Sequence, residues 1–280
     1  MKFRREELEI SDGRRLYLYH FQDAAETHER QAGFWSSVSD NWHGSRDMVE
    51  RWFGPVTKAM LERLGPGPGR LLDLGCGAQS MPLPGGWDVV GVDVTRPMLR
   101  PESRVLVGSC NPLALRSGAF DAAVSRFALM FAADAGEAIG EAERVLNSCG
   151  RLVFSVWGPA EQNLWSEIPS EVLSRRLGIR PPEPDEPHAF RLAGLDETKD
   201  LLTAAGFEAD EPESVIVPYM ADLDCHGALE AMLTLAGPLR TAVARLPEAE
   251  RAETLEEIEG RYANADMTGH AFVWSAKKRS

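Results

Sequence analysis

The stretch "LLDLGCGAQS", residues 71–80, decides the fold class of this chain. Leucines surround Asp73, and Gly75 and Gly77 follow two positions apart. An apolar strand that runs straight into a tight glycine turn is typical of nucleotide-binding α/β folds, because a residue without Cβ lets the backbone approach the ligand. The third glycine that such a loop usually carries is absent, and Gln79 stands in its place.

Further apolar runs recur after this loop and predict a series of strands. Strands are expected at residues 70–74, 87–93, 104–108, 120–125, 151–157, 214–219 and 270–278. Most of the first five are continuous apolar runs, as in parallel strands that are covered on both faces. Between the fourth and the fifth, residues 134–147 carry one apolar helical face, and Asp134 can cap its first turn. This alternation predicts an α/β fold with a doubly wound sheet.

Residues 1–64 are expected to form an N-terminal hairpin and a helical cap ahead of the core. Residues 8–21 predict the hairpin, with Asp12-Gly13 at its turn. Residues 45–64 have the apolar spacing of a helix, but Gly54-Pro55 predicts a break into two short helices.

Residues 65–280 are expected to form the core domain, with insertions at residues 158–194 and 225–263. The first insertion begins as a helix and ends in a proline-rich loop, and the second predicts two or three helices. Ligands of open α/β sheets bind outside the carboxyl ends of the strands. We therefore expect residues 1–64 and both insertions to build a substrate pocket there.

The composition limits the partners. The 280 residues are 44% hydrophobic, enough for a full core, and the net charge of −13 repels nucleic acids and anionic membranes. No apolar run approaches the roughly 20 residues of a membrane span, and the N-terminus lacks a signal-peptide core. The four cysteines form no C-x-x-C pair, so no metal site is expected. These features favour a cytoplasmic monomer or homodimer.

The second strand carries the clue to the nucleotide. Asp93 ends that strand 18 residues after Gly75, where an acid can accept two ribose hydroxyls. NAD and S-adenosylmethionine both offer such a ribose. A dinucleotide loop needs glycine at the position of Ser80, and the following "MPLPGG" makes a poor helix N-terminus for a pyrophosphate. Both features disfavour an NAD-dependent oxidoreductase.

Six ordered motifs resemble those of one enzyme family. They are "LLDLGCG", "VVGVDVTRPML", "FDAAVSRFALMF", "EAERVLNSCGRLVFSVW", "FRLAGLDETKDLLTAAGF" and "AFVWSAKK". From about Phe34 to the C-terminus the chain resembles class I S-adenosylmethionine-dependent methyltransferases, within them the ubiquinone/menaquinone C-methyltransferase-like (type 11) group. The resemblance implies a Rossmann-like seven-stranded sheet with the last strand antiparallel, S-adenosylmethionine as cofactor, and methyl transfer to a small organic molecule.

The resemblance also implies ten cofactor-binding residues. They are Asp73, Gly75, Cys76, Gly77, Asp93, Val94, Ser109, Cys110, Arg126 and Phe127. Asp73, Gly75 and Gly77, in and after the first strand, would line the methionine side of the cofactor. Asp93, at the end of the second strand, would hold the ribose, and Val94 would lie against the adenine. Ser109 and Cys110, after the third strand, would face the adenine edge. Arg126 and Phe127, after the fourth strand, would lie at the sulfonium. Trp35 and Trp42, in a segment expected to be irregular, are candidates to close over the cofactor.

Two residues depart from the family pattern. Gln79 replaces the third loop glycine, and Ser109 replaces the acid that usually binds the adenine amine. The crossovers on either side of the second strand are also short. An alternative is therefore a methyltransferase-fold protein with weakened or lost cofactor binding, acting as a ligand-binding or regulatory module or as a non-methylating enzyme.

No catalytic residue is predicted, because methyl transfer from a sulfonium depends mainly on holding the reactants in line. An acidic acceptor would benefit from a base. Candidates in segments that could cap the pocket are His43, His188, His226 and Tyr219.

Overall fold

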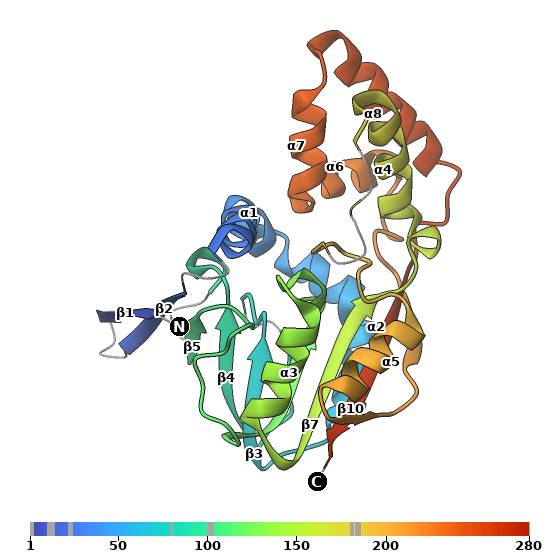
Figure 1. Cartoon of the computed structure of the whole chain (residues 1–280). Helices are drawn as coiled ribbons and strands as arrows, with labels where there is room; N and C mark the ends of the chain where they lie inside the picture. The colour runs from blue at the N-terminus through green and yellow to red at the C-terminus, as the bar shows by residue number, and fades with distance from the viewer. Residues whose placement is uncertain are drawn as a thin grey trace.

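The protein folds around one twisted sheet (Figure 1). The computed structural model describes residues 3–9, 15–21, 25–78, 81–99, 104–179, 182 and 186–279, with side chains from His28 onward. In this described part the sheet has ten strands in the order β1-β2-β5-β4-β3-β6-β7-β10-β8, and β9 also pairs with β10.

Five parallel strands form the centre of the sheet. They are β3 (Gly69–Leu74), β4 (Trp87–Asp93), β5 (Val105–Val107), β6 (Phe120–Arg126) and β7 (Leu146–Trp157). The chain builds outward from β3 to β5 and then returns to β6 on the other side of β3. The strand order therefore reverses between β3 and β6, which is where open α/β sheets bind ligands.

The last strand, β10 (Gly269–Lys278), runs antiparallel to β7, as predicted. Its other edge pairs with two short strands, β8 (Phe207–Ala209) and β9 (Glu213–Val217), where the sequence predicted only one. Pro212 lies between them and has no N–H for the ladder, which is a reason for the interruption. The α/β class with an antiparallel last strand is confirmed.

A hairpin extends the sheet beyond the seven predicted positions. Strands β1 (Phe3–Glu9) and β2 (Arg15–Phe21) pair antiparallel, and β2 pairs parallel with β5 through Leu18 and Val107. Its turn at residues 12–13 lies outside the described residues.

Two long helices replace the N-terminal segments that were expected to be irregular or broken. Helix α1 (Ala25–Gly44) includes Trp35 and Trp42, so the prediction of an irregular segment there was wrong. Helix α2 (Arg46–Leu64) continues through Pro55, so the predicted break was also wrong. The buried face of α2 is continuous on both sides of the proline. Burial of several large side chains, at about 1.5–3 kcal/mol each, offsets the roughly 3 kcal/mol that an interior proline costs.

Helices cover both faces of the sheet. Helices α3 (Ala135–Val145) and α5 (Leu195–Ala204) lie in front of it in Figure 1, and α2 lies behind. Asp134 caps α3 as predicted, because its carboxylate accepts the Glu137 N–H at 2.8 Å. The crossovers beside β4 are short, as expected: the described residues between β3 and β4 form no helix, and a 3₁₀ turn, η1 (Arg96–Met98), follows β4.

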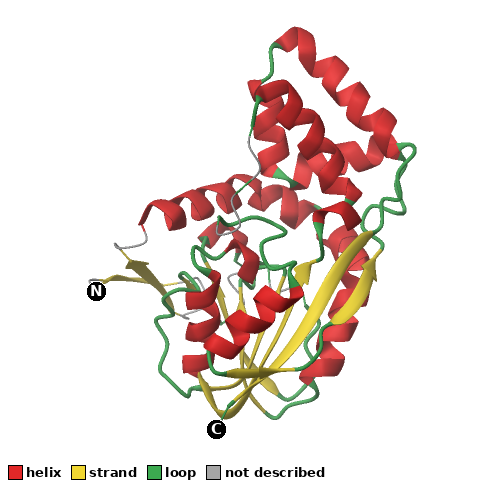
Figure 2. Cartoon of the chain, turned by 45° about the vertical axis from the view of Figure 1, so that its right-hand side comes forward, coloured by secondary structure: helices red, strands yellow, loops and turns green. Residues whose placement is uncertain are grey.

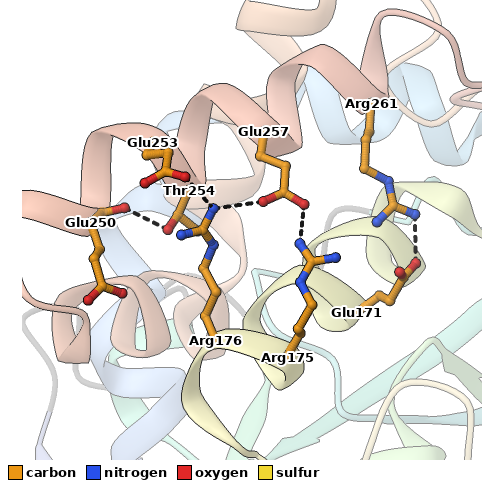
Figure 3. Close-up of polar contacts among 8 residues, drawn as sticks. All are labelled: Glu171, Arg175, Arg176, Glu250, Glu253, Thr254, Glu257 and Arg261. Atoms are coloured by element: carbon orange, nitrogen blue, oxygen red, sulfur yellow. Dashed lines mark hydrogen bonds and ion pairs between the residues drawn. The ribbon is translucent and has the colours of Figure 1, made fainter.

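The two insertions meet in one helical cap above the carboxyl ends of the central strands (Figures 1 and 2). The cap helices are α4 (Leu164–Leu177), α6 (Cys225–Leu235), α7 (Gly237–Arg245) and α8 (Glu248–Tyr262). Ion pairs join α4 to α8 (Figure 3): Arg176 binds Glu257 at 2.8 Å, and Arg261 binds Glu171 at 2.6 Å. The Tyr262 hydroxyl also donates to the buried Trp165 carbonyl at 2.6 Å. Residues 225–263 hold three helices, within the two or three that the sequence predicted, whereas the division of the chain into two domains stays a prediction.

Candidate functional site

A cavity opens at the carboxyl ends of the central strands, where the strand order reverses. All ten residues that the sequence assigned to a cofactor line it: Asp73, Gly75, Cys76, Gly77, Asp93, Val94, Ser109, Cys110, Arg126 and Phe127. They come from the ends of four strands, β3 to β6, and the fold brings every one of them to the same space.

The loop after β3 needs glycine at Gly75. Its φ is +68°, and an added Cβ would lie 2.2 Å from the Cβ of Ala128. Its N–H donates to the Val92 carbonyl at 2.8 Å, which ties the loop to β4. Gly77 also has a positive φ, of +48°. Gln79 and Ser80 lie outside the described residues, so the departure at Gln79 stays untested.

Asp93 connects the loops that follow β3 and β4. One carboxylate oxygen accepts the Gly77 N–H at 2.9 Å, and the other accepts the Thr95 N–H at 3.1 Å. Burial raises the pKa of Asp93 to about 6, and these backbone hydrogen bonds oppose that rise. Each carboxylate oxygen has a further lone pair, so Asp93 can still accept hydroxyl groups from a ligand.

A charged cluster occupies the end of the cavity between β3, β6 and α2. Burial raises the pKa of Asp73 to about 7, Arg126 lowers it, and Asp93 raises it further. The Arg126 guanidinium forms a two-pronged ion pair with Glu50, at 2.5 and 2.8 Å, and donates to the Thr57 hydroxyl at 2.7 Å. The structure thus places a paired arginine beside a buried acid.

Phe127 forms a strained part of the cavity wall. Its φ is +54°, which is uncommon for a bulky residue. Its N–H donates to the Ser155 hydroxyl at 3.1 Å, and its ring stacks on Trp157 with 4.4 Å between centroids. Such backbone strain persists only where the surroundings enforce it, and it gathers at functional sites.

Both cavity cysteines are neutral thiols. Burial, reinforced by Asp73 and Asp93, raises the pKa of Cys76 well above its usual value, and burial raises that of Cys110 to about 12. The thiolate is the nucleophilic form of cysteine, so neither side chain is an activated nucleophile.

The opposite end of the cavity, after β5, is lined by polar side chains that are joined by hydrogen bonds. The Ser109 hydroxyl lies 2.7 Å from His28 Nε2 and accepts the Asn111 N–H at 3.1 Å. The Asn111 side chain in turn donates to Glu137 at 3.4 Å. Ser109 was predicted from the sequence, whereas His28 and Asn111 were not.

One face of α1 closes the cavity. His28, Gln31, Trp35 and Trp42 all line it. The spacing of the first three, i, i+3 and i+7, is helical and was the available signal. Trp35 packs edge-on against Phe131, with 5.3 Å between ring centroids, and Trp42 donates its indole N–H to the Leu235 carbonyl of the cap at 3.1 Å.

The insertions were expected to help build a substrate pocket at the carboxyl ends of the strands; they lie on that side of the sheet, and the pocket itself stays a prediction. No described residue of 158–194 or 225–263 lines the cavity, which is bounded by α1, α2 and the strand ends. The cap contacts α1: the Asn41 side chain donates to the Thr234 carbonyl at 2.9 Å.

Of the four candidate bases only His43 lines the cavity. Its Nε2 lies 2.9 Å from the Pro97 carbonyl, an acceptor, so that nitrogen carries the proton. Tyr219 is buried among aromatic rings, with 4.8 Å between its centroid and that of Trp165. His226 is exposed and faces Glu259, and His188 lies apart from the cavity.

Residues 72–154 match a family model described as a methyltransferase domain. A demethylmenaquinone methyltransferase of Paenarthrobacter aurescens (strain TC1) is 31% identical over 142 residues, which are 48% of this chain. The chain carries a class I methyltransferase domain. The match spans 55% of that relative, so the chain covers about half of its length.

Solved structures place the methyltransferase fold over most of the chain. The phosphoethanolamine N-methyltransferase 2 of Haemonchus contortus, solved with S-adenosylhomocysteine, has a TM-score of 0.53 at 17% identity, over 93% of this chain and 61% of its own. The cyclase SpnF has a TM-score of 0.51 at 19% identity, over 87% of this chain and 96% of its own. The matched methyltransferase domain supports S-adenosylmethionine as the cofactor.

The cavity of the methyltransferase domain also has unmet hydrogen-bonding capacity. Ser125 Oγ and Gln31 Oε1 are buried in its wall without a partner. A buried polar atom without a partner costs about 1–3 kcal/mol, so both atoms fit a polar ligand. In the described residues no cluster of three or more histidine, cysteine or acidic side chains could hold a metal ion. None of the described helices is long and apolar enough to span a membrane.

Proposed function

We propose that this protein binds S-adenosylmethionine in the cavity at the ends of β3 to β6 and transfers its methyl group to a small organic molecule. The observation that carries the proposal is the convergence of all ten predicted cofactor residues on that cavity. Gly75 allows the turn that lines this cavity, because its φ of +68° and the nearby Ala128 side chain leave no room for a Cβ. The partnerless Ser125 hydroxyl of the same wall offers a hydrogen bond to a polar ligand.

The proposed orientation follows from Asp93. Its carboxylate would hold the ribose hydroxyls, because an acid at the end of the second core strand lies beside the ribose in nucleotide-binding folds. The adenine would then lie toward Ser109 and Cys110 after β5. The methionine and sulfonium would lie toward Asp73, Arg126 and Phe127.

This chain's own residues would bind, orient and exclude water. The bound cofactor supplies an electrophilic methyl group, and the protein has to hold an acceptor in line with it. The rings of Trp35, Phe53 and Phe131 line the cavity and would keep water away, and an aromatic face also attracts a sulfonium. His43 is the candidate base, where the acceptor needs one.

The side chains that line the cavity also indicate the chemical class of the methyl acceptor. The apolar and aromatic ones fit an uncharged or amphipathic small molecule, because the Arg126 charge is paired with Glu50. In the same proposal the protein acts in the cytoplasm as a monomer or homodimer without nucleic-acid or membrane partners. The net charge of −13 supports this, since it repels phosphate-rich surfaces.

A second candidate is a non-methylating or ligand-binding protein on the same fold. The presence of a cyclase among the structural neighbours and the replacement of the usual acid by Ser109 favour it. The two candidates differ in whether the cavity holds the cofactor tightly.

Calorimetric titration separates them. S-adenosylhomocysteine should bind wild type with micromolar affinity, and NAD should not bind at millimolar concentration. Absence of S-adenosylhomocysteine binding up to millimolar concentration would favour the second candidate. Binding of NAD without S-adenosylhomocysteine would instead revive a dehydrogenase.

A further inference from the structure

One charged side chain of the cavity, Arg46, has no role in the proposed cofactor site. Arg46 is the first residue of α2, and Trp42 and His43 lie in the last turn of α1. All three side chains line the cavity. They form its α1–α2 corner, the part of the wall where the two helices meet.

The charge of Arg46 is not balanced by a neighbouring acid. Both carboxylate oxygens of Glu50, one turn further along α2, bind Arg126, at 2.5 and 2.8 Å. In the part of the chain that the structure describes, no ion pair or hydrogen bond engages the Arg46 side chain. A guanidinium keeps its proton in proteins, so this corner carries a lasting positive charge and favours an anionic group of a ligand.

The surrounding charges indicate which anion fits. Asp73 and Asp93 already lie buried in the same cavity, where burial raises the pKa of each carboxyl. One guanidinium balances one negative charge, whereas a dianion would add repulsion to this acidic set. The planar guanidinium also matches a carboxylate, which it can bind through two parallel hydrogen bonds. A carboxylate therefore suits this corner better than a phosphate ester.

A row of aromatic rings leads from the α1–α2 corner to the end of β6. Trp42 packs edge-on against Trp35, with 5.9 Å between ring centroids, and Trp35 packs edge-on against Phe131, with 5.3 Å. Phe131 ends the 3₁₀ turn η2 (Leu129–Phe131), which follows β6. All three rings line the cavity. Aromatic rings offer large apolar contact areas, so the row suits the apolar body of a ligand.

We propose that the methyl acceptor is an amphipathic carboxylic acid, with its carboxylate on Arg46 and its apolar body along Trp42, Trp35 and Phe131. This inference rests on the proposed function and names the class of its acceptor. The row of rings separates Arg46 from the end of β6, where the sulfonium is proposed to lie. The carboxylate is therefore the group that anchors the acceptor, and the methyl group goes to an atom at its other end.

The test compares two probes with the same ring system that differ in charge. Naphthylacetate carries a carboxylate, and naphthylacetamide carries a neutral amide in its place. Each is titrated by calorimetry into the full chain saturated with S-adenosylhomocysteine. Wild type should prefer the carboxylate by about five- to tenfold, because a charge-assisted pair is stronger than a neutral one.

The preference should follow the charge at position 46. Arg46→Gln should reduce it to about twofold or less, because the glutamine amide is neutral. Arg46→Lys should keep about half of it, since lysine retains the charge but not the two-pronged geometry. The control is Arg51→Gln, on the same helix, because the Arg51 side chain is 62% exposed and pairs with Asp222 outside the cavity. It should leave the preference unchanged.

A further variant tests the aromatic row separately from the charge. Trp35→Ala should weaken both probes by a similar factor, about three- to tenfold, because the ring contacts the part that they share. The preference for the carboxylate should then remain. Thermal melts check that each variant is folded.

The outcomes distinguish this inference from the proposed function. Equal binding of the two probes by wild type, binding of neither at millimolar concentration, or an unchanged preference in Arg46→Gln would overturn the inference. Weaker S-adenosylhomocysteine binding in Arg46→Gln, with the preference between probes unchanged, would instead assign Arg46 to the cofactor's own carboxylate. Each of these results leaves the proposed function standing. Failure of wild type to bind S-adenosylhomocysteine would overturn both.

Discussion

The two ends of the cavity use different physics. The end beside β6 is built from charges, with Arg126 held by Glu50 at 2.5 and 2.8 Å and Asp73 buried next to them. The end after β5 is built from neutral groups, with Ser109 and His28 2.7 Å apart. Charges act over distance and tolerate variation in position, whereas buried neutral hydrogen bonds depend on orientation.

This contrast indicates what each end can select. The guanidinium of Arg126 and the carboxylate of Glu50 cancel, so Asp73 remains as the acid that a cationic methionine group would face. At the other end, Ser109 and His28 line the cavity with hydrogen-bonding groups that select by shape and by donor and acceptor pattern, and the Glu137 carboxylate lies behind them on Asn111. Affinity for the cofactor's charge and specificity for its base are therefore expected to come from opposite ends.

The largest effect is expected at Gly75, in the tight turn that follows β3. Gly75→Ala would place a Cβ 2.2 Å from that of Ala128 and force alanine to a φ of +68°. We expect a loss of roughly 2–4 kcal/mol in the free energy of unfolding, measured by urea titration, and at least a hundredfold weaker S-adenosylhomocysteine binding.

Gly140→Ala is the matched control, since this glycine lies inside α3 with open space around it. Alanine there should stabilise the helix by about 0.5–1 kcal/mol and leave binding unchanged. Equal behaviour of the two variants would refute a steric requirement at Gly75.

The next effect concerns Asp93, which lies between the two ends. Asp93→Ala should weaken S-adenosylhomocysteine binding by about 2–3 kcal/mol, because two hydroxyls lose a charged acceptor. Asp88→Ala, in an exposed ion pair with Arg104 at the start of the same strand, should bind as wild type does. An unchanged dissociation constant in folded Asp93→Ala would remove this residue from the site.

The buried acid at the charged end should make stability depend on pH. Burial raises the pKa of Asp73 from 3.8 to about 7, so the folded state keeps a proton that the unfolded state has released. Its stabilising contribution is complete below pH 3.8 and disappears as the pH rises to about 7. Raising the pH from 5 to 7 should therefore cost wild type about 2 kcal/mol through this group.

Asp73→Asn should remove that part of the pH dependence. Urea titrations at pH 5 and pH 8 would show the variant gaining stability relative to wild type at the higher pH, while its cofactor binding weakens. A pH dependence identical to that of wild type would show that Asp73 ionises normally.

Much of the core could be predicted because parallel strands are encoded locally. The apolar runs before Asp73 and Asp93 predict that both residues lie at the ends of strands. Parallel strands bring their carboxyl ends to the same edge of a sheet. All ten candidate residues consequently line one cavity. The two N-terminal helices were harder. Helix α1 has little apolar periodicity, and the continuity of α2 through Pro55 depends on burial that only the fold supplies.

The contact between Ser109 and His28 could not be predicted from the sequence either. Ser109 was found by its position after a strand, but its partner His28 lies 81 residues earlier, so no local pattern joins them. Gln79 and Ser80 lie outside the described residues, so the effect of the missing loop glycine stays a prediction.

The smallest expected effect concerns the ion pair between Arg126 and Glu50 at the β6 end of the cavity. Glu50→Gln would remove one negative charge beside Arg126, near the proposed position of the sulfonium. S-adenosylmethionine, a cation at that group, should then bind about five- to tenfold more weakly, which is roughly 1–1.4 kcal/mol, whereas neutral-sulfur S-adenosylhomocysteine should change little. Glu62→Gln, an exposed acid of the same helix, is the control. Equal loss for both ligands would point to a general packing defect instead.

The central claim is that one ligand spans a charged end and a neutral end. A crystal structure of the protein with S-adenosylhomocysteine tests it most directly. The account predicts adenine density within hydrogen-bonding distance of Ser109, ribose hydroxyls on Asp93, and the amino acid end beside Asp73. A ligand that lies in the reverse direction, or in another part of the molecule, would contradict it.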